Sequence, residues 1–182
     1  DGKWTALGAP QSLTVVADSH SMPALPELQA HNDFERKLAQ LQAALTATQA
    51  YSAQLGAELT TLRATAAAYP VNHQELINQT EAAQQQFEAV NRELQGGGFG
   101  GGPGGPPSLA ARLNAAAGAE RASLSHPTQT SLDAYQMASS ALAALLPQLQ
   151  KLGETAVPQL KAAFAAAGAP IPGALPKWPS GR

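Results

Sequence analysis

The chain has 182 residues, of which 44% are apolar and 39 are alanine, whereas only nine are aromatic. Side chains this small favour closely packed helices over a sheet rich in Val and Ile, and the length suffices for one domain with an extension. A net charge of −2 excludes a general nucleic-acid-binding protein, the lack of cysteine excludes disulfides and thiolate chemistry, and no apolar run reaches the roughly 20 residues that cross a bilayer.

Residues 1–18 differ from the rest because short apolar patches alternate with turn-forming residues. Leu13, Val15 and Val16 suit a strand, while Gly8 would interrupt a helix. This pattern predicts a short β-hairpin. Two strands are not stable alone in water, so we expect the hairpin to join a sheet from outside the chain or to lie flat on the helices.

Residues 19–95 predict a long antiparallel pair of helices. From Pro26 onward, apolar or small residues recur every three or four positions, which is the period of a helix with one buried face. The first helix should stop near Tyr69 because Pro70 follows, and a short turn should return the second helix along the first. The expected buried positions are Phe34, Leu38, Leu41, Leu45, Thr48, Ser52, Leu55, Leu59, Leu62, Ala66 and Tyr69, then Leu76, Thr80, Ala83, Phe87, Val90 and Leu94.

Residues 96–107 read GGGFGGGPGGPP, a composition typical of a flexible linker. Phe99 is the large side chain of this stretch and therefore its candidate anchor. A formal G-x-G-x-x-G match at Gly100, Gly102 and Gly105 carries no weight, because it follows a helix rather than a strand.

Residues 108–168 predict the second helical half of the bundle. Ser108 is expected to cap a short helix and Pro127 to open a long one. Pro147 should kink or break the long helix, and Gly168 should end the last one. The expected buried positions are Leu109, Leu113 and Ala116, then Leu132, Tyr135, Ser139, Leu142, Leu146 and Leu149, and finally Val157, Leu160 and Phe164.

The sequence carries no residue pattern that is specific to an enzyme. Its acids are scattered singly over helix surfaces, and its Ser, His and Asp residues form no nucleophile motif. His31 and Glu35 share a helix face, but a solvated pair is a simpler interpretation than a metal site. We therefore expect no catalytic residues, no cofactor and no bound metal ion.

Large apolar side chains on irregular backbone are the strongest candidates for a functional surface. Aromatic anchors are enriched in interfaces, and residues 169–182 should form an extended Pro-rich tail that loses little entropy on docking. The alternative is that these side chains fold back over the bundle and close its core. The candidate partner-binding residues are Trp4, Phe99, Ile171, Leu175 and Trp178.

Five segments together carry a resemblance to a known family: DGKWTALGAPQSLTVVADS, LQAHNDFERKLAQLQAAL, SLAARLNAAAGAE, HPTQTSLDAYQMASSALAALLPQLQKL and VPQLKAAFAAAGAPIP. They resemble the region that follows the β-propeller in bacterial sortilin-like proteins, which carry BNR-type repeats and are described as glycosyl hydrolases. The resemblance covers nearly the whole chain. It implies the C-terminal part of an exported protein whose hydrolase site would lie in the propeller, so it assigns no catalytic residue here.

The predicted fold is mainly α: an antiparallel bundle of four or five helices with a short N-terminal β-hairpin and an extended C-terminal tail. The predicted function is a non-catalytic structural module, periplasmic or extracellular, that binds other protein chains of a larger bacterial envelope assembly such as a respiratory or photosynthetic one. It should neither span the membrane nor bind nucleic acid.

Two alternatives stay open. One is a helical fragment of an exported sortilin-like glycosyl hydrolase whose propeller is missing. The other is a free-standing coiled-coil homo-oligomer in which the seam from Phe34 to Tyr69 pairs between copies. Thr48 and Ser52 disfavour the oligomer, because both are poor core residues in a simple two-stranded coil.

Overall fold

A computed structural model of the protein describes residues 8–9, 12–16, 23–69, 74–96, 107–120 and 124–172. Within these residues the chain is a helical bundle, as the sequence predicts. Its helical elements are α1 (Leu25–Ala68), α2 (Gln74–Gln95), α3 (Leu109–Glu120), α4 (Gln129–Lys151), the π-helix η1 (Leu152–Ala156) and α5 (Val157–Ala166).

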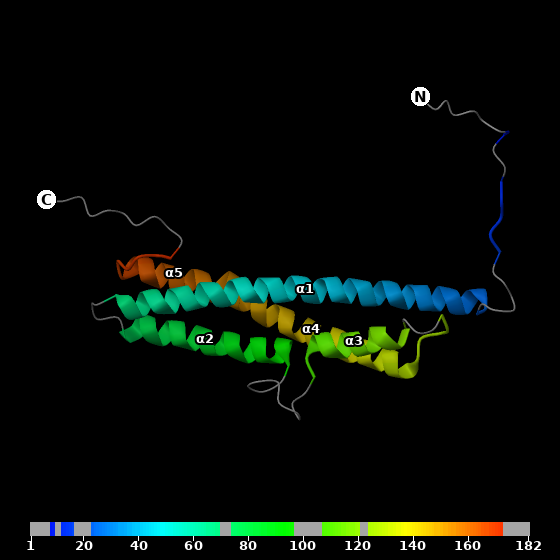
Figure 1. Ribbon diagram of the computed structural model, residues 1–182. Helices are drawn as coiled ribbons and strands as arrows, with labels where there is room; N and C mark the ends of the chain where they lie inside the picture. The colour runs from blue at the N-terminus through cyan, green and yellow to red at the C-terminus, as the bar shows by residue number, and fades with distance from the viewer. Residues whose placement is uncertain are drawn as a thin grey trace.

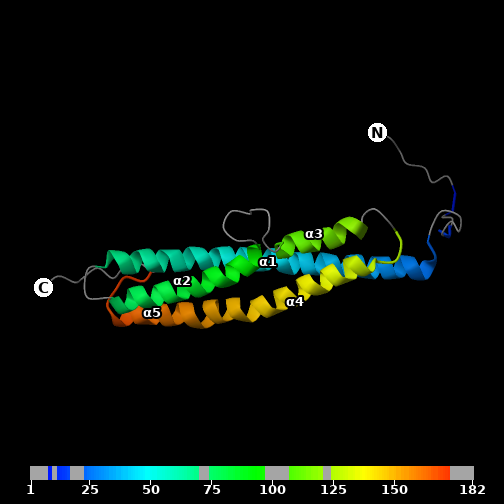
Figure 2. The ribbon, with the colours of Figure 1, turned by 90° about the horizontal axis from the view of Figure 1, so that it is seen from below.

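The elements form three long rods that lie side by side (Figure 1). The first rod is α1, whose 44 residues span about 66 Å at 1.5 Å per residue. In the second rod, α2 runs antiparallel to the C-terminal half of α1, and α3 continues in the same direction along its N-terminal half (Figures 1 and 2). The third, which we call the returning rod, joins α4, η1 and α5 and runs parallel to α1.

The predicted seam of α1 is confirmed as the face that the other helices cover. Leu41 and Tyr69 are partly buried and pack against the core. The helix ends at Ala68, and Tyr69 is already extended, as expected before a proline. The buried residues of α1 are His31, Phe34, Leu38, Leu45, Thr48, Ser52, Leu55, Leu59, Leu62 and Ala66.

Thr48 and Ser52, two of the polar residues inside this seam, have hydrogen-bond partners. The Thr48 hydroxyl donates to the carbonyl of Ala44 at 2.8 Å, one turn earlier in α1. The Ser52 hydroxyl donates to Asn91 Oδ1 at 3.1 Å, which links α1 to α2. Burial of a hydroxyl is favourable only with such a partner, so the polar middle of the seam fits a contact with α2 in the same chain.

The buried faces predicted for α2 and α3 are also confirmed. The six core positions expected in α2 are all buried, and so are Leu109, Leu113 and Ala116 in or beside α3. Ser108 caps α3, because its Oγ accepts the N–H of Ala111 at 3.0 Å. Gly96 ends α2 in the left-handed region, with φ of 70°, and its Cα lies directly against the backbone of Ser108.

The predicted start and register of α4 are partly wrong. Thr128 rather than Pro127 marks the start, because the Thr128 hydroxyl accepts the N–H of Ser131 and the helix begins one residue later. Leu145 is buried where Leu146 was expected, and Leu146 is 38% exposed. The buried residues of α4 are Ser131, Ala138, Leu142, Leu145 and Leu149, whereas Leu132, Tyr135 and Ser139 are only partly buried.

Of the kink or break expected at Pro147, the break does not occur, since α4 continues through Pro147 to Lys151. Pro147 and Ala143, whose carbonyl loses its intrahelical donor, are both exposed, so water can satisfy that carbonyl. The irregular turn comes instead at η1, where the Val157 N–H donates to the carbonyl of Leu152, five residues back. Pro158 follows at once, and the wider turn before it gives its ring room that a regular α-helix lacks.

The last helix is tied to α1 at two points. Val157, Leu160 and Phe164 are buried as predicted. Lys161 of α5 forms an ion pair with Glu58 of α1, and the Tyr69 hydroxyl donates to the carbonyl of Gly168 at 3.2 Å.

Gly168 ends the helix as predicted, with φ of 70°. The Ala169 N–H donates to the carbonyl of Phe164 and the Gly168 N–H to that of Ala165, which together form a Schellman motif.

The predicted N-terminal hairpin is not supported. Residues 12–16, the longest described part of 1–18, form no strand, and Leu13, Val15 and Val16 are 82, 88 and 78% exposed. A strand needs a neighbouring strand to accept its backbone hydrogen bonds, and no described residue offers one. The predicted Pro-rich tail is described only as far as Pro172, and the rest lies outside the described residues.

Replacing Gly168 by alanine should lower the free energy of unfolding by about 1 to 2 kcal/mol, because a Cβ disfavours its positive φ. Urea denaturation followed by circular dichroism measures the change. Gly118→Ala is the matched control: Gly118 lies in α3 with open space around it, so alanine should raise the stability by up to about 1 kcal/mol. Equal effects of the two substitutions would contradict the left-handed cap.

Candidate interaction groove

A groove of about 640 Å³ runs between α2 and the returning rod, and we call it the α2 groove. Its floor consists of buried Ala83, Val90, Leu152 and Leu160. Its rim is exposed, and it combines small or uncharged polar side chains with one cation: Gln79, Ala82, Gln86, Ala89, Gln148, Lys151, Thr155 and Gln159.

The small side chains explain the shape of this groove. Where Ala82 and Ala89 face the returning rod, each side chain ends at Cβ, so neither fills the wedge between the two helices. The four glutamines stand at the edges and present amide donors and acceptors to whatever enters. Chemically the groove therefore offers apolar contact below and hydrogen bonds at the sides.

The π-turn η1 forms part of the same wall, because Leu152, Thr155 and Ala156 all line the groove. Behind this wall, Gly153 of η1 lies directly against the hydroxyl of Tyr51 from α1, and a Cβ at Gly153 would overlap that oxygen. The approach needs glycine for space rather than for an unusual backbone angle. Tyr51 thus supports the turn from the α1 side.

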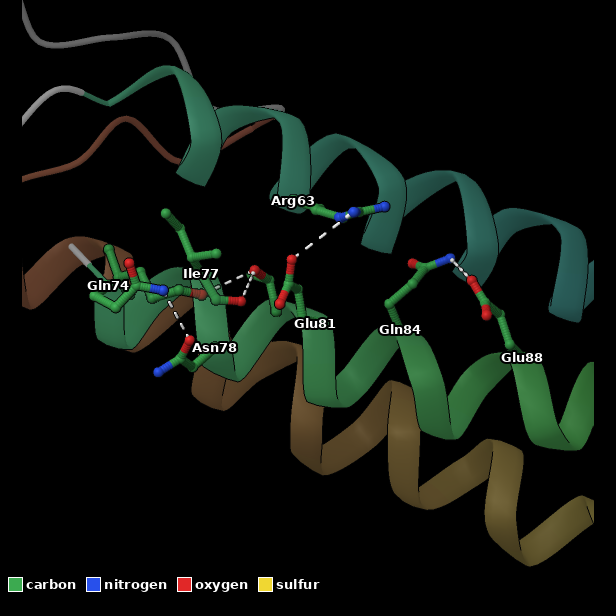
Figure 3. Close-up of polar contacts among 9 residues, drawn as sticks. Arg63, Gln74, Ile77, Asn78, Glu81, Gln84 and Glu88 are labelled. Atoms are coloured by element: carbon green, nitrogen blue, oxygen red, sulfur yellow. Dashed lines mark hydrogen bonds and ion pairs between the residues drawn. The ribbon is translucent and has the colours of Figure 1, made fainter.

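The opposite edge of α2 is occupied by polar contacts (Figure 3). Glu81 lies 3.8 Å from Arg63 of α1, and both side chains are about half exposed. Gln84 donates to Glu88 at 3.2 Å within α2. An exposed ion pair of this kind contributes at most about 1 kcal/mol, so these contacts orient α2 on α1 more than they hold it there.

The structure places one of the five predicted partner-binding residues. Ile171 is partly buried and packs against the hydrophobic core, so its side chain closes the end of the bundle. Trp4, Phe99, Leu175 and Trp178 lie outside the described residues.

The interpretation of His31 and Glu35 as a solvated pair is wrong for His31, which is only 6% exposed. His31 lies three residues before Phe34 and extends the buried seam of α1 toward its N-terminus. Among the described residues no group of three or more His, Asp and Glu side chains could hold a metal ion. None of the described helices is both long and apolar enough to cross a membrane.

Comparison of the chain with family models, curated proteins and solved structures gave no significant match. The resemblance to sortilin-like proteins therefore stays a prediction. The α2 groove could not be predicted from the sequence, because its rim consists largely of Ala and Gln, which are also common on ordinary solvent-exposed helix faces. A signal was present only in Pro158, whose place after a helical run marks the irregular turn.

Gly153→Ala should lower the stability of the wild-type protein more than it lowers the stability of the Tyr51→Phe variant. The Tyr51→Phe variant lacks the hydroxyl that a Cβ at position 153 would meet. We expect a coupling of about 0.5 to 1 kcal/mol in a double-mutant cycle. Urea denaturation of the four proteins measures it. A coupling of zero would mean that Tyr51 does not support the π-turn.

Proposed function

We propose that the protein is a non-catalytic structural and interaction module that binds another protein chain within a larger assembly. The observation that carries this proposal is the α2 groove, a concave surface between α2 and the returning rod with exposed small and polar side chains at its rim and buried apolar side chains at its floor. The partner element that fits it is a helix with small or aliphatic residues on one face. Such a helix would add a fourth rod to the three that the chain supplies.

The dimensions and chemistry of the groove support a helix as its occupant. Packed helices lie 8 to 10 Å apart, and alanine on the facing surfaces allows the closer of these separations. The glutamines on both sides match the polar flanks of an amphipathic helix, since an amide can both donate and accept. With Lys151 as the charged member of the described lining, an acidic flank on the partner would complement it.

The location of this assembly follows from the sequence resemblance rather than from the groove. A protein like the C-terminal part of an exported sortilin-like protein would act outside the cytoplasm, in the periplasm or beyond, as an accessory or scaffolding subunit. Trp4, Phe99, Leu175 and Trp178 stay in this proposal as further partner contacts. They would add aromatic and aliphatic anchors to the contact made in the groove.

Filling the groove should release the partner without unfolding the chain. Ala89 is exposed on the rim, so Ala89→Arg adds a long charged side chain at the position where a partner helix would lie. We expect association to weaken at least about tenfold, as for a substitution inside an interface core. Native electrophoresis of extracts from source cells that express either version measures the assembled fraction.

Ala57→Arg is the matched control, because Ala57 is an exposed helical alanine of α1 that lines none of the described pockets. Both variants should keep the helical circular dichroism of the wild type and lie within about 0.5 kcal/mol of each other in stability. Equal assembly of the two variants would contradict the groove as the docking site. Migration of the wild-type chain alone would contradict the proposed assembly itself.

One observation favours the alternative of a longer parent protein. Leu13, Val15 and Val16 are highly exposed in a segment of strand-forming residues, and such a segment is stable as a strand only against a sheet from elsewhere. In a larger sortilin-like protein, preceding strands of the same polypeptide would provide that sheet. The intact mass of the protein isolated from its source distinguishes the two possibilities. A mass of about 18.7 kDa favours a separate subunit, and a much larger mass favours a longer parent protein.

Of the three interpretations of the protein, the coiled-coil homo-oligomer has the least support. The seam that would pair between copies is covered by α2, α3 and the returning rod of the same chain. Pairing between copies would require these helices to separate first.

A further inference from the structure

A second concavity, of about 640 Å³, lies between the end of α2, the start of α3 and the middle of α4. We call it the junction pocket. Its lining comes from all three helices and differs from that of the α2 groove, because it includes two arginines and a methionine. The described lining residues are Arg92, Glu93, Gly96, Pro107, Leu109, Arg112, Gln136, Met137, Ser140 and Ala141.

The guanidinium of Arg112 is held in place at this pocket. Its Nε donates to the carbonyl of Pro107 at 3.3 Å, and its Nη1 lies 3.7 Å from the sulfur of Met137. A guanidinium carries five N–H donors, so these two contacts leave further donors on the same group. Contacts that already favour one orientation of an arginine reduce the side-chain entropy that is lost when it binds a carboxylate.

The charges on the pocket leave one cation in excess. Arg92 and Arg112 contribute two positive charges, and Glu93 contributes one negative charge. Gln136 and Ser140 lie one turn apart on α4 and add an amide and a hydroxyl to the lining. The Gln136 amide donates a hydrogen bond to the Ser140 hydroxyl at 3.2 Å. A ligand with a single negative charge would neutralise the described lining.

The remaining lining is apolar, and part of it is exposed. Met137 is 51% exposed although its side chain is large and hydrophobic. Met137 and Ala141 lie one turn apart on α4, and Leu109 and Pro107 face them from the start of α3. Methionine is flexible and polarizable, so it adapts to aliphatic chains of differing shape.

We propose that the junction pocket binds an aliphatic carboxylate. Arg112 and Arg92 bind the carboxylate group, and the hydrocarbon chain lies against Leu109 and Met137. The volume lies within the 300 to 1,000 Å³ that is typical of small-molecule sites. This site is separate from the α2 groove and does not depend on the protein-binding function proposed for it.

The test is a titration of the protein with octanoate, followed by NMR of methionine methyl groups. The chain has two methionines, Met22 and Met137, so ¹³C-methyl labelling gives two signals, which Met137→Leu assigns. We expect the Met137 signal to shift and saturate with octanoate, and octan-1-ol at the same concentrations to shift it much less. Each further CH₂ in the acid should tighten binding by about threefold to fourfold.

Arg112→Gln should weaken octanoate binding by at least about tenfold, since it removes a charge-assisted hydrogen bond. Arg63→Gln is the control, because Arg63 is an exposed arginine of α1 outside the pocket. If Arg112→Gln lowers the helical signal, Arg92→Gln replaces it, because the Arg92 side chain is exposed. No saturable shift, equal shifts with acid and alcohol, or unchanged affinity in the arginine variants would each overturn the proposal.

Discussion

The bundle depends on one continuous buried stripe along α1, which is mostly apolar. Neither α2, with 22 residues, nor α3, with 12, is long enough to cover that stripe alone, so each covers half of it. Phe34 near one end meets Tyr135 of α4 edge to face, with ring centroids 5.7 Å apart, and Leu62 near the other end is fully buried. The two halves therefore share one core, because the same helix contributes to both.

The two concave surfaces lie where the other rods depart from regular α-helix. Gly96 turns the chain out of α2 with a positive φ and lies against Ser108, so α3 starts beside the point where α2 stops. The junction pocket lies at that step, between residues of α2, α3 and α4. In the returning rod, the π-turn before Pro158 rearranges one wall of the α2 groove. Both places keep a backbone hydrogen bond, from Gly96 to Arg92 and from Val157 to Leu152, but in a geometry that departs from the regular α-helix beside each concave surface.

Sequence periodicity predicted the helices and most of the core because leucines recur at a spacing of three and four among alanines. It failed in α4, where Leu145 and Leu146 are adjacent and either fits the pattern, and where small Ala138 and Ser131 provide buried positions. It could not decide between a kink and a break at Pro147, because the effect of a proline depends on whether the freed carbonyl faces water, and the helix does not break there. The grooves could not be predicted, since a cavity depends on how residues from separate helices of two rods meet, and alanine and glutamine suit exposed faces equally well.

The two surfaces differ in charge, and this difference separates what they can bind. The α2 groove has glutamine amides and a single cation, Lys151, on its rim, so the proposed contacts with a partner would be chiefly apolar and only weakly sensitive to salt. The junction pocket brings two guanidinium groups onto apolar side chains, and one of them is already oriented by Pro107 and Met137. The surfaces share no described residue, so the two proposed ligands, a protein helix and a small anion, would not compete for the same side chains. Both surfaces include α2 and α4, so movement of α2 against the returning rod would change them together.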